Sequence, residues 1–394
     1  MNRHVIILAL CQGLIVTGNI MLVAITALIG QKISPSVAWI TLPVATQCFG
    51  LLLATIPASL LMAKTGRRLG FTIGNFIGIS GALLGWFALE HYSFVLFCIA
   101  TGLIGIGIGF ATLYRFAAIE ACPDKPSQAI SLIMASGVVA AVIGPNLAIW
   151  VDHHIDSINY SATFLALAAL YSLAIVLLQF VRFNAAQNEQ DSGPARPLKH
   201  IMRQEAFIIA AFVAMVSYTL MNLLMTATPL AMHRHGFDLA QSALVIEWHV
   251  LGMFLPSFFT GKLIVKIGQI HTMLLGSVLM LLCIGINLLG VSHQHFLVAL
   301  FALGVGWNFM FIAATQMVSQ TYQPSEKAKS QAANEFLVFS MVTVSALGAG
   351  WLESTVGFQR LNSVSIVPLC LVIVLLLKFK LNDKKQQLQI ANQE

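Results

Sequence analysis

Four ionisable side chains lie inside long apolar stretches of this sequence: Arg115, Glu247, His249 and Glu335. A charge in the hydrocarbon core of a membrane costs roughly 3 kcal/mol or more, so such residues generally mark a functional position. In surroundings of low dielectric constant a carboxyl group favours its neutral form, which brings proton exchange toward physiological pH. We therefore expect Glu247 to exchange protons, with His249 as the second candidate. The alternative for each is a structural hydrogen bond to a neighbouring helix.

Arg115 and Glu335 carry opposite charges at similar depths. Arg115 precedes Pro123 by eight residues, and Glu335 follows Lys329 by six. At about 1.5 Å of helix rise per residue, these spacings correspond to depths of about 12 and 9 Å. We expect both side chains to face a central cavity and to form and break a salt bridge as a gate. The alternatives are that Arg115 reaches lipid headgroups or pairs with Glu120.

Amide and aromatic side chains also recur within the apolar stretches. Such groups can line a cavity for a small, partly aromatic or amphipathic solute, and amides can equally join neighbouring helices. The candidates for lining a cavity are Asn19, Gln47, Tyr114, Asn222, Trp307, Asn308 and Gln316.

Cysteine and histidine do not form a pattern typical of metal binding. The six cysteines are scattered through or beside the apolar stretches, a spacing that fits neither a disulfide framework nor a metal site. Several histidines gather in or beside a few loops, but no loop supplies a close set of ligands for a transition metal. We expect no metal site, no cofactor and no catalytic residue. The histidines that gather in this way are His91, His153, His154, His233, His235, His293 and His295.

The elements that position these residues follow from composition. Only 9% of the 394 residues are charged and 58% are hydrophobic, whereas a soluble domain carries roughly 25% charged residues. A helix needs about 20 apolar residues to cross a bilayer, and the runs lack the alternation of a membrane barrel. We therefore expect an all-α membrane protein with about twelve transmembrane helices. The predicted spans are 5–30, 37–62, 69–89, 94–120, 128–151, 160–182, 205–231, 239–265, 270–291, 296–321, 329–352 and 361–379.

The distribution of basic residues predicts the orientation. All but four of the 21 Lys and Arg residues fall in segments on one side of the predicted membrane, which the positive-inside rule assigns to the cytoplasm. Both termini are then cytoplasmic, in a multi-pass protein of the cytoplasmic (inner) membrane. The net charge of +6 reflects this topology and contact with anionic lipid rather than nucleic-acid binding.

The chain divides into two halves that resemble each other. We expect a six-helix bundle over 1–183, a polar cytoplasmic linker over 184–203, a second bundle over 204–381 and a mobile tail over 382–394. A shift of 202 positions places Gly50 on Gly252, Gly66 on Gly268 and Gly74 on Gly276, and a shift of 199 places Gly105 and Gly107 on Gly304 and Gly306. Such repeats are typical of transporters whose two bundles open alternately to each side.

Three short motifs make the chain resemble the major facilitator superfamily along nearly its whole length. One ends in Lys64-Thr65-Gly66-Arg67-Arg68, and its second copy runs from Gly261 through Lys266-Ile267-Gly268. Both lack the family's Asp, which is replaced by Ala63 and Val265. The third, Gly137-x6-Gly144-Pro145, is a partial form of the family's antiporter motif. The resemblance implies that the conformational motif residues are Gly66, Arg67, Arg68, Gly144, Pro145, Gly261 and Gly268.

These features together predict a secondary active transporter and not an enzyme. We expect a monomer that moves a small organic solute by alternating access, coupled to protons, and the partial antiporter motif favours export over uptake. The sequence has no Gly-x-x-x-x-Gly-Lys-Ser/Thr loop for ATP. Two alternatives stay open: transport of a metal or metal chelate, and facilitated diffusion without coupling.

Overall fold

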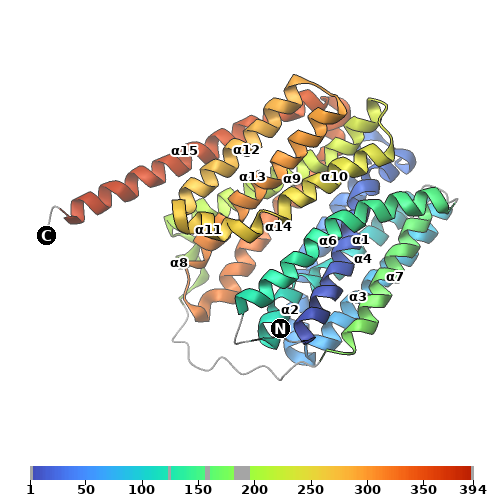
Figure 1. Ribbon diagram of the computed structural model, residues 1–394, viewed down its shortest axis with the longest axis horizontal. Helices are drawn as coiled ribbons and strands as arrows, with labels where there is room; N and C mark the ends of the chain where they lie inside the picture. The colour runs from blue at the N-terminus through green and yellow to red at the C-terminus, as the bar shows by residue number, and fades with distance from the viewer. Residues whose placement is uncertain (1–2, 123–125, 156–159, 182–195, 392–394) are drawn as a thin grey trace.

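The computed structural model describes residues 3–122, 126–155, 160–181 and 196–391, and within them every regular element is a helix (Figure 1). The elements are α1 (Arg3–Ile33), η1 (Val37–Trp39), α2 (Leu42–Thr65), α3 (Arg67–Glu90), α4 (Phe94–Ala111), α5 (Tyr114–Ala121), α6 (Pro126–His154), α7 (Ser161–Leu178), α8 (Leu198–Met202), α9 (Glu205–Arg234), α10 (Leu239–Phe254), α11 (Ser257–Ile267), α12 (Gln269–Leu289), α13 (His293–Ser319), η3 (Pro324–Glu326), α14 (Lys327–Thr355) and α15 (Phe358–Ala391).

The described helices confirm the predicted fold class. Eleven are long and apolar enough to cross a membrane, and the bent pair α10–α11 makes up to twelve spans. Two predicted spans are broken. The pair α10–α11 bends by 44° next to Pro256, because proline has no N–H to continue the helix. The predicted span 94–120 stops at Ala111 and resumes as the short helix α5 at Tyr114.

The helices form two groups that lie side by side, the first half of the chain in blue to green and the second in yellow to red (Figure 1). Each group has its own hydrophobic core. One core runs from Val5 to Val181, and the other is built almost entirely from residues between Ile201 and Leu376. The few first-half residues in the second core are Ile20, Ala140 and Ala141, so α1 and α6 contact the second bundle.

Packing at the repeated glycines supports the internal repeat. A Cβ atom at Gly105 of α4 would lie 1.9 Å from the Gln47 carbonyl oxygen of α2. At the equivalent Gly304 of α13, it would lie 2.3 Å from the His249 carbonyl oxygen of α10. Gln47 and His249 are themselves related by the shift of 202 positions. Within each bundle, therefore, the same pair of helices comes into close contact at equivalent positions: α4 with α2 in the first bundle and α13 with α10 in the second.

Two glycines of the conformational motif form matching turns. Gly66 joins α2 to α3 with φ +87°, and Gly268 joins α11 to α12 with φ +85°. Only glycine adopts this backbone region without strain. We refer to the end of the molecule that bears these two turns and α8 as the linker end, and to the opposite end, where α1, α9 and α14 terminate, as the far end.

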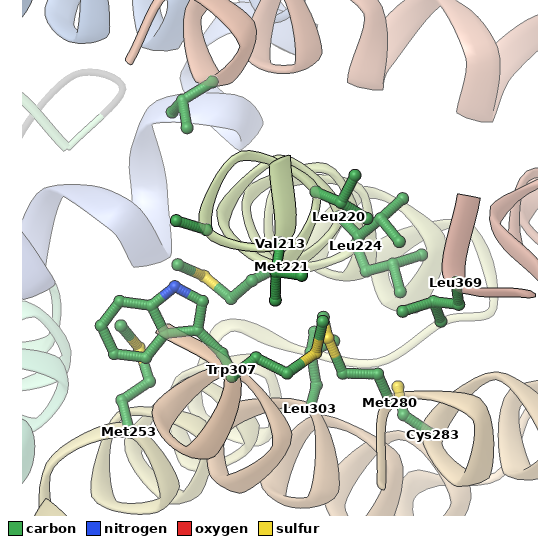
Figure 2. Close-up of a cluster of buried hydrophobic side chains, with 14 of the residues drawn as sticks. Val213, Leu220, Met221, Leu224, Met253, Met280, Cys283, Leu303, Trp307 and Leu369 are labelled. Carbon is green, nitrogen blue, oxygen red and sulfur yellow. The ribbon is translucent and has the colours of Figure 1, made fainter. Parts of the chain in front are cut away.

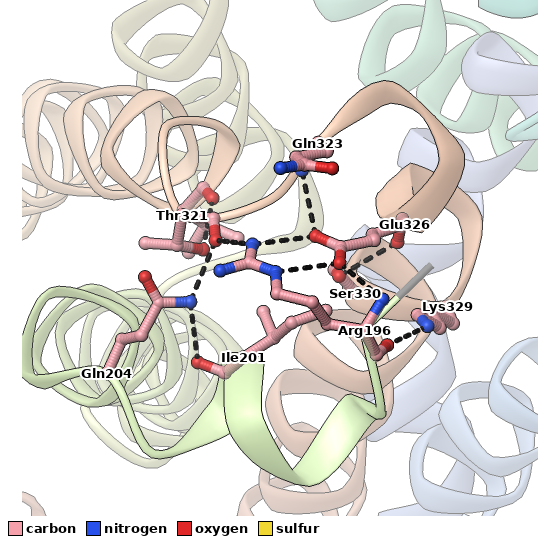
Figure 3. A network of polar contacts seen from close by, with 9 residues as sticks. Arg196, Ile201, Gln204, Thr321, Gln323, Glu326, Lys329 and Ser330 are labelled. Atoms are coloured by element: carbon pink, nitrogen blue, oxygen red, sulfur yellow. Dashed lines mark hydrogen bonds and ion pairs between the residues drawn. The ribbon is translucent and has the colours of Figure 1, made fainter. Parts of the chain in front are cut away.

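The predicted linker and the predicted tail both contain helical residues within the described part of the chain. Most of the predicted linker, residues 184–195, lies outside the described part of the chain. Its last residues form α8 and dock on the second bundle, where Ile201 is fully buried. Arg196 binds both oxygens of the buried Glu326 carboxylate at 2.7 and 2.8 Å (Figure 3). Residues 382–391 of the predicted tail belong to α15, which runs to Ala391; the mobility of the tail stays a prediction.

Candidate functional site

A cavity of about 220 Å³ lies between the two bundles. Its walls come from α1, α2 and α4 of the first bundle and from α9, α10 and α14 of the second. Three of the predicted lining residues, Asn19, Gln47 and Asn222, contribute to these walls. Each bundle therefore supplies part of one shared site.

Amide groups form the polar part of the cavity. In the first bundle Gln47 Nε2 donates to Asn19 Oδ1 at 2.7 Å, joining α2 to α1. In the second, Asn222 Nδ2 donates to Ser345 Oγ at 3.1 Å and to the Val342 carbonyl at 3.4 Å, joining α9 to α14. These hydrogen bonds fix the orientation of the amides toward the cavity.

Aromatic rings from the second bundle form an apolar part of the lining, which we call the aromatic wall. Tyr218 of α9 and Phe339 of α14 line the cavity, with ring centroids 5.4 Å apart. Trp307 and Phe311 of α13 pack behind Tyr218, at 5.2 and 5.3 Å from its ring. Edge-to-face contacts of this kind hold the rings rigidly. Figure 2 shows the Trp307 indole among the side chains of the second core, beside the cavity-lining Met221 and Met253.

Every described side chain that lines this cavity is uncharged at neutral pH. A buried charge is costly unless another charge or a set of hydrogen bonds compensates it. The cavity therefore suits a neutral, amphipathic molecule that has a planar apolar face and groups able to bond to amides.

The other predicted lining residues lie elsewhere. Tyr114 packs inside the first bundle, stacked on Phe71 with centroids 3.9 Å apart. Asn308 is buried at the α10–α11 bend, where it donates to the Met253 carbonyl at 2.7 Å; a bent helix needs such a partner for its freed backbone groups. Trp307 lies behind the wall rather than in it, and Gln316 is exposed.

Glu247 does not line the cavity; it bridges the bundles. Its Oε2 accepts a hydrogen bond of 2.9 Å from Asn146 Nδ2 of α6, which also donates to the Val142 carbonyl at 2.7 Å. Glu247 is half-buried, and its neighbour Trp248 is 42% exposed. The carboxyl group therefore lies in the seam between α6 and α10, where it joins the two bundles.

His249 lies on a different face of α10 and is fully buried in the second bundle. Its Nδ1 is 2.8 Å from the Leu300 carbonyl oxygen. A carbonyl only accepts, so Nδ1 carries the proton and Nε2, which has no partner among the described atoms, is the unprotonated nitrogen of a neutral ring. This arrangement matches the alternative of a structural hydrogen bond between helices.

The predicted gate involves Arg115 and Glu335. The side chain of Arg115 lies outside the described residues, although its backbone belongs to α5. Glu335 is half-buried on α14 and takes part in a contact. The predicted span that holds Arg115 is interrupted between Ala111 and Tyr114. The gate stays a prediction.

The conformational motif residues divide into turns and packing positions. Besides the Gly66 and Gly268 turns, Arg68 donates to the Val181 carbonyl and thereby ties α3 to the end of α7. The φ angle of Gly261 is ordinary, and a Cβ atom there would meet nothing within 4 Å.

In α6, a Cβ at Gly144 would lie 2.9 Å from the Thr17 carbonyl oxygen of α1, and one at Gly137 would lie 3.1 Å from the Phe254 ring of α10. Pro145 is inside α6. The partial antiporter pattern is therefore a helix-packing feature, because its glycines are the points where α6 closes on its neighbours.

A polar latch closes the far end. The Thr41 hydroxyl at the start of α2 donates to the Leu347 carbonyl and accepts from the Gly350 N–H of α14, both at 3.1 Å. Beside it, Ala27, Leu28, Ile40 and Leu230 form a small apolar cluster between the bundles. These contacts join the two bundles at the far end.

Sequence reasoning missed several of these residues. Tyr218 and Phe339 read as ordinary helix aromatics, and Thr41 and Asn146 as ordinary polar residues near span ends. The Arg196–Glu326 pair joins positions 130 apart in the sequence, and only the fold brings them together. A signal did exist for Asn146, since it directly follows the Gly144-Pro145 pair.

Comparison with known proteins identifies the family to which the chain belongs. A family model for the Major Facilitator Superfamily matches residues 8–247 and 210–394. The riboflavin transporter RfnT of Brucella anthropi is 37% identical over 383 residues, which cover 96% of each chain. Two uncharacterized MFS-type transporters of Bacillus subtilis, YddS and YdeG, are 27% and 30% identical over 92% and 80% of this chain, and over 88% and 77% of their own. The chain therefore belongs to the major facilitator superfamily and is a multi-pass transporter of the cytoplasmic membrane.

Proposed function

We propose that this transporter carries riboflavin or a closely related neutral flavin through the cavity between the bundles. The observation that carries the proposal is the cavity itself, an uncharged site that combines amide groups with an aromatic wall. Riboflavin is uncharged and joins a planar ring system to a hydroxylated chain, so its two parts match these two kinds of lining group. The name of the relative RfnT points to the same substrate.

This proposal narrows the small, partly aromatic or amphipathic solute expected from the sequence. The alternative of a metal or metal chelate finds less support, because the described cavity lining offers amides, hydroxyls, thioethers and one thiol rather than the carboxylates or imidazoles typical of sites for such ions. The apolar lining instead favours an organic ring.

We further propose that transport is coupled to protons at Glu247. A protonated, neutral carboxyl and a charged carboxylate differ in the hydrogen bonds they make with Asn146, and this contact joins α6 to α10. The protonation state of Glu247 would then bias the opening of the bundles. The alternative is an uncoupled facilitator, in which the Glu247–Asn146 bond only stabilises one conformation.

The test is transport by the full chain in liposomes. Wild-type protein should accumulate labelled riboflavin when a pH gradient is imposed, and a protonophore should abolish the accumulation. Glu247→Gln should lose gradient-driven accumulation but retain exchange of internal for external riboflavin, because Gln keeps a hydrogen-bonding group but cannot titrate. Equal accumulation by wild type and Glu247→Gln would remove Glu247 from the coupling mechanism.

The direction of transport is measured in the same vesicles. The expectation of export rested on the Gly144-Pro145 pattern, and close packing of α6 on α1 accounts for that glycine. The proposal therefore carries no direction. Reversing the imposed gradient shows whether flavin moves with the protons or against them.

A further inference from the structure

We propose that the Asn19–Gln47 amide pair binds the hydroxylated chain of the flavin and that the wall of Tyr218 and Phe339 stacks on its ring, so that the site selects the free vitamin over its phosphate ester. This inference rests on the proposed function and assigns a role to each wall of the cavity. In this arrangement the hydroxyl groups of the ribityl chain, as well as the ring, determine which flavin binds.

The amide pair has unused hydrogen-bonding capacity on the side of the cavity. The bond from Gln47 Nε2 to Asn19 Oδ1 uses one N–H and one oxygen. A primary amide has two N–H donors and one carbonyl acceptor. The pair can therefore still donate from Asn19 Nδ2 and from the second Gln47 N–H, and still accept at Gln47 Oε1. Because the pair is already joined, little side-chain entropy is lost when a ligand binds.

This mixture of donors and acceptors fits hydroxyl groups. Each hydroxyl is both a donor and an acceptor, so neighbouring hydroxyls of a ribityl chain can pair with Asn19 Nδ2 and Gln47 Oε1 together. A phosphate ester is mostly a dianion at neutral pH, and a phosphate dianion only accepts. It would have to approach the Gln47 carbonyl oxygen without a donor to offer, in a lining that contains no cation among its described residues.

We place the ring of the flavin against the aromatic wall of Tyr218 and Phe339. Tyr218 and Phe339 come from α9 and α14 of the second bundle, whereas Asn19 and Gln47 come from α1 and α2 of the first. The packing of Trp307 behind Tyr218 keeps the wall rigid. A flavin that spans the cavity would thus contact both bundles, which links recognition of the whole molecule to closure of the bundles around it.

The experiment compares ligands and variants in a cycle. Binding of riboflavin, lumiflavin and riboflavin 5′-phosphate to the purified full chain is measured by quenching of flavin fluorescence. Lumiflavin carries a methyl group in place of the ribityl chain. Wild type should bind riboflavin more tightly than lumiflavin, and riboflavin 5′-phosphate should compete at least tenfold less well than riboflavin.

Variants then locate the discrimination. Gln47→Ala should weaken riboflavin binding about three- to tenfold, as expected for the loss of one or two neutral hydrogen bonds, and leave lumiflavin binding unchanged. Gln47→Met keeps the length of the side chain and should behave alike. Tyr218→Leu should weaken both ligands. Gln316→Ala, an exposed amide outside the cavity, is the matched control and should change neither.

The outcomes separate this inference from the proposed function. Suppose that wild type binds riboflavin and lumiflavin. If Gln47→Ala and Gln47→Met then weaken the binding of both ligands equally, or of neither, the assignment of the amide pair is overturned while flavin transport stands. Equal competition by riboflavin 5′-phosphate overturns the selection against the phosphate. If wild type binds no flavin at all, the proposed function fails and this inference fails with it. The melting temperature of each purified variant shows independently of ligand binding whether it is folded.

Discussion

Thr41 provides a direct test of how the far end is held closed. It is the residue before α2, a position where threonine commonly caps its own helix, yet its side chain makes no such cap. Instead the hydroxyl binds the Leu347 carbonyl and the Gly350 N–H of α14 in the other bundle. Thr41→Val keeps the shape and removes both bonds, so the substitution acts on the contact between the bundles and spares α2.

The magnitude follows from the two bonds. A neutral hydrogen bond contributes about 0.5–1.5 kcal/mol net, so losing both should destabilise the closed far end by about 1–3 kcal/mol. That corresponds to a shift of roughly 5- to 150-fold in the ratio of open to closed conformations. The apolar cluster of Leu28, Ile40 and Leu230 is untouched, so the variant should fold and still close part of the time.

The assay is a distance distribution between spin labels across the far end. Val37 and Thr355 are exposed on η1 and at the end of α14, and cysteines there can be labelled in a background without the native cysteines. Thr41→Val should populate longer distances. Thr228→Val is the matched control, since the buried Thr228 hydroxyl binds only the Leu224 carbonyl of its own helix. An unchanged distribution in Thr41→Val, or the same change in Thr228→Val, would refute the latch.

Three further substitutions and one change of pH test other parts of the account. Gly105→Ala should lower the melting temperature, because its Cβ atom would lie 1.9 Å from a backbone oxygen and such overpacking costs about 1–3 kcal/mol. Gly285→Ala is the control, since a Cβ atom there meets nothing within 4 Å. Equal effects of the two substitutions would contradict the close approach. Arg196→Ala should release the linker from Glu326 and speed proteolysis there, and unchanged cleavage would contradict the docking. Hydrogen bonds from Arg196 lower the pKa of Glu326 from 4.5 to about 2, so docking should persist from pH 8 to 5 and weaken only as the pH falls toward 2; loss of protection near pH 6 would contradict this. Asn146→Ala should alter the pH dependence of transport if Glu247 acts through the seam, and an unchanged pH profile would argue against it.

Much of the fold could be predicted from the sequence because a membrane restricts the choices. Backbone groups in lipid must pair within helices, so long apolar runs gave the spans to within a few residues, and the glycine repeat gave the two related bundles. Helix breaks were harder. Pro256 lies inside a run that reads as one span, and nothing in the run before Tyr114 indicates that α4 ends at Ala111.

The cavity was predicted only in part because its composition is common. Amides at Asn19, Gln47 and Asn222 line it, but Asn308 has the same chemistry and is used to satisfy the backbone at the helix bend. Which face of a helix turns inward depends on packing between distant segments. The orientation of both termini toward the cytoplasm stays a prediction from the basic residues, as does the Arg115–Glu335 gate.

Exchange of labelled riboflavin by purified protein in liposomes tests the central claim most directly. Val23 lines the cavity and Val265 is 85% exposed on α11, so Val23→Trp should fill the site while Val265→Trp adds the same bulk elsewhere. The account predicts exchange by wild type and Val265→Trp, and little or none by Val23→Trp. Exchange by wild type no faster than in protein-free liposomes, or equal exchange by folded Val23→Trp protein, would contradict transport of riboflavin through the cavity between the bundles.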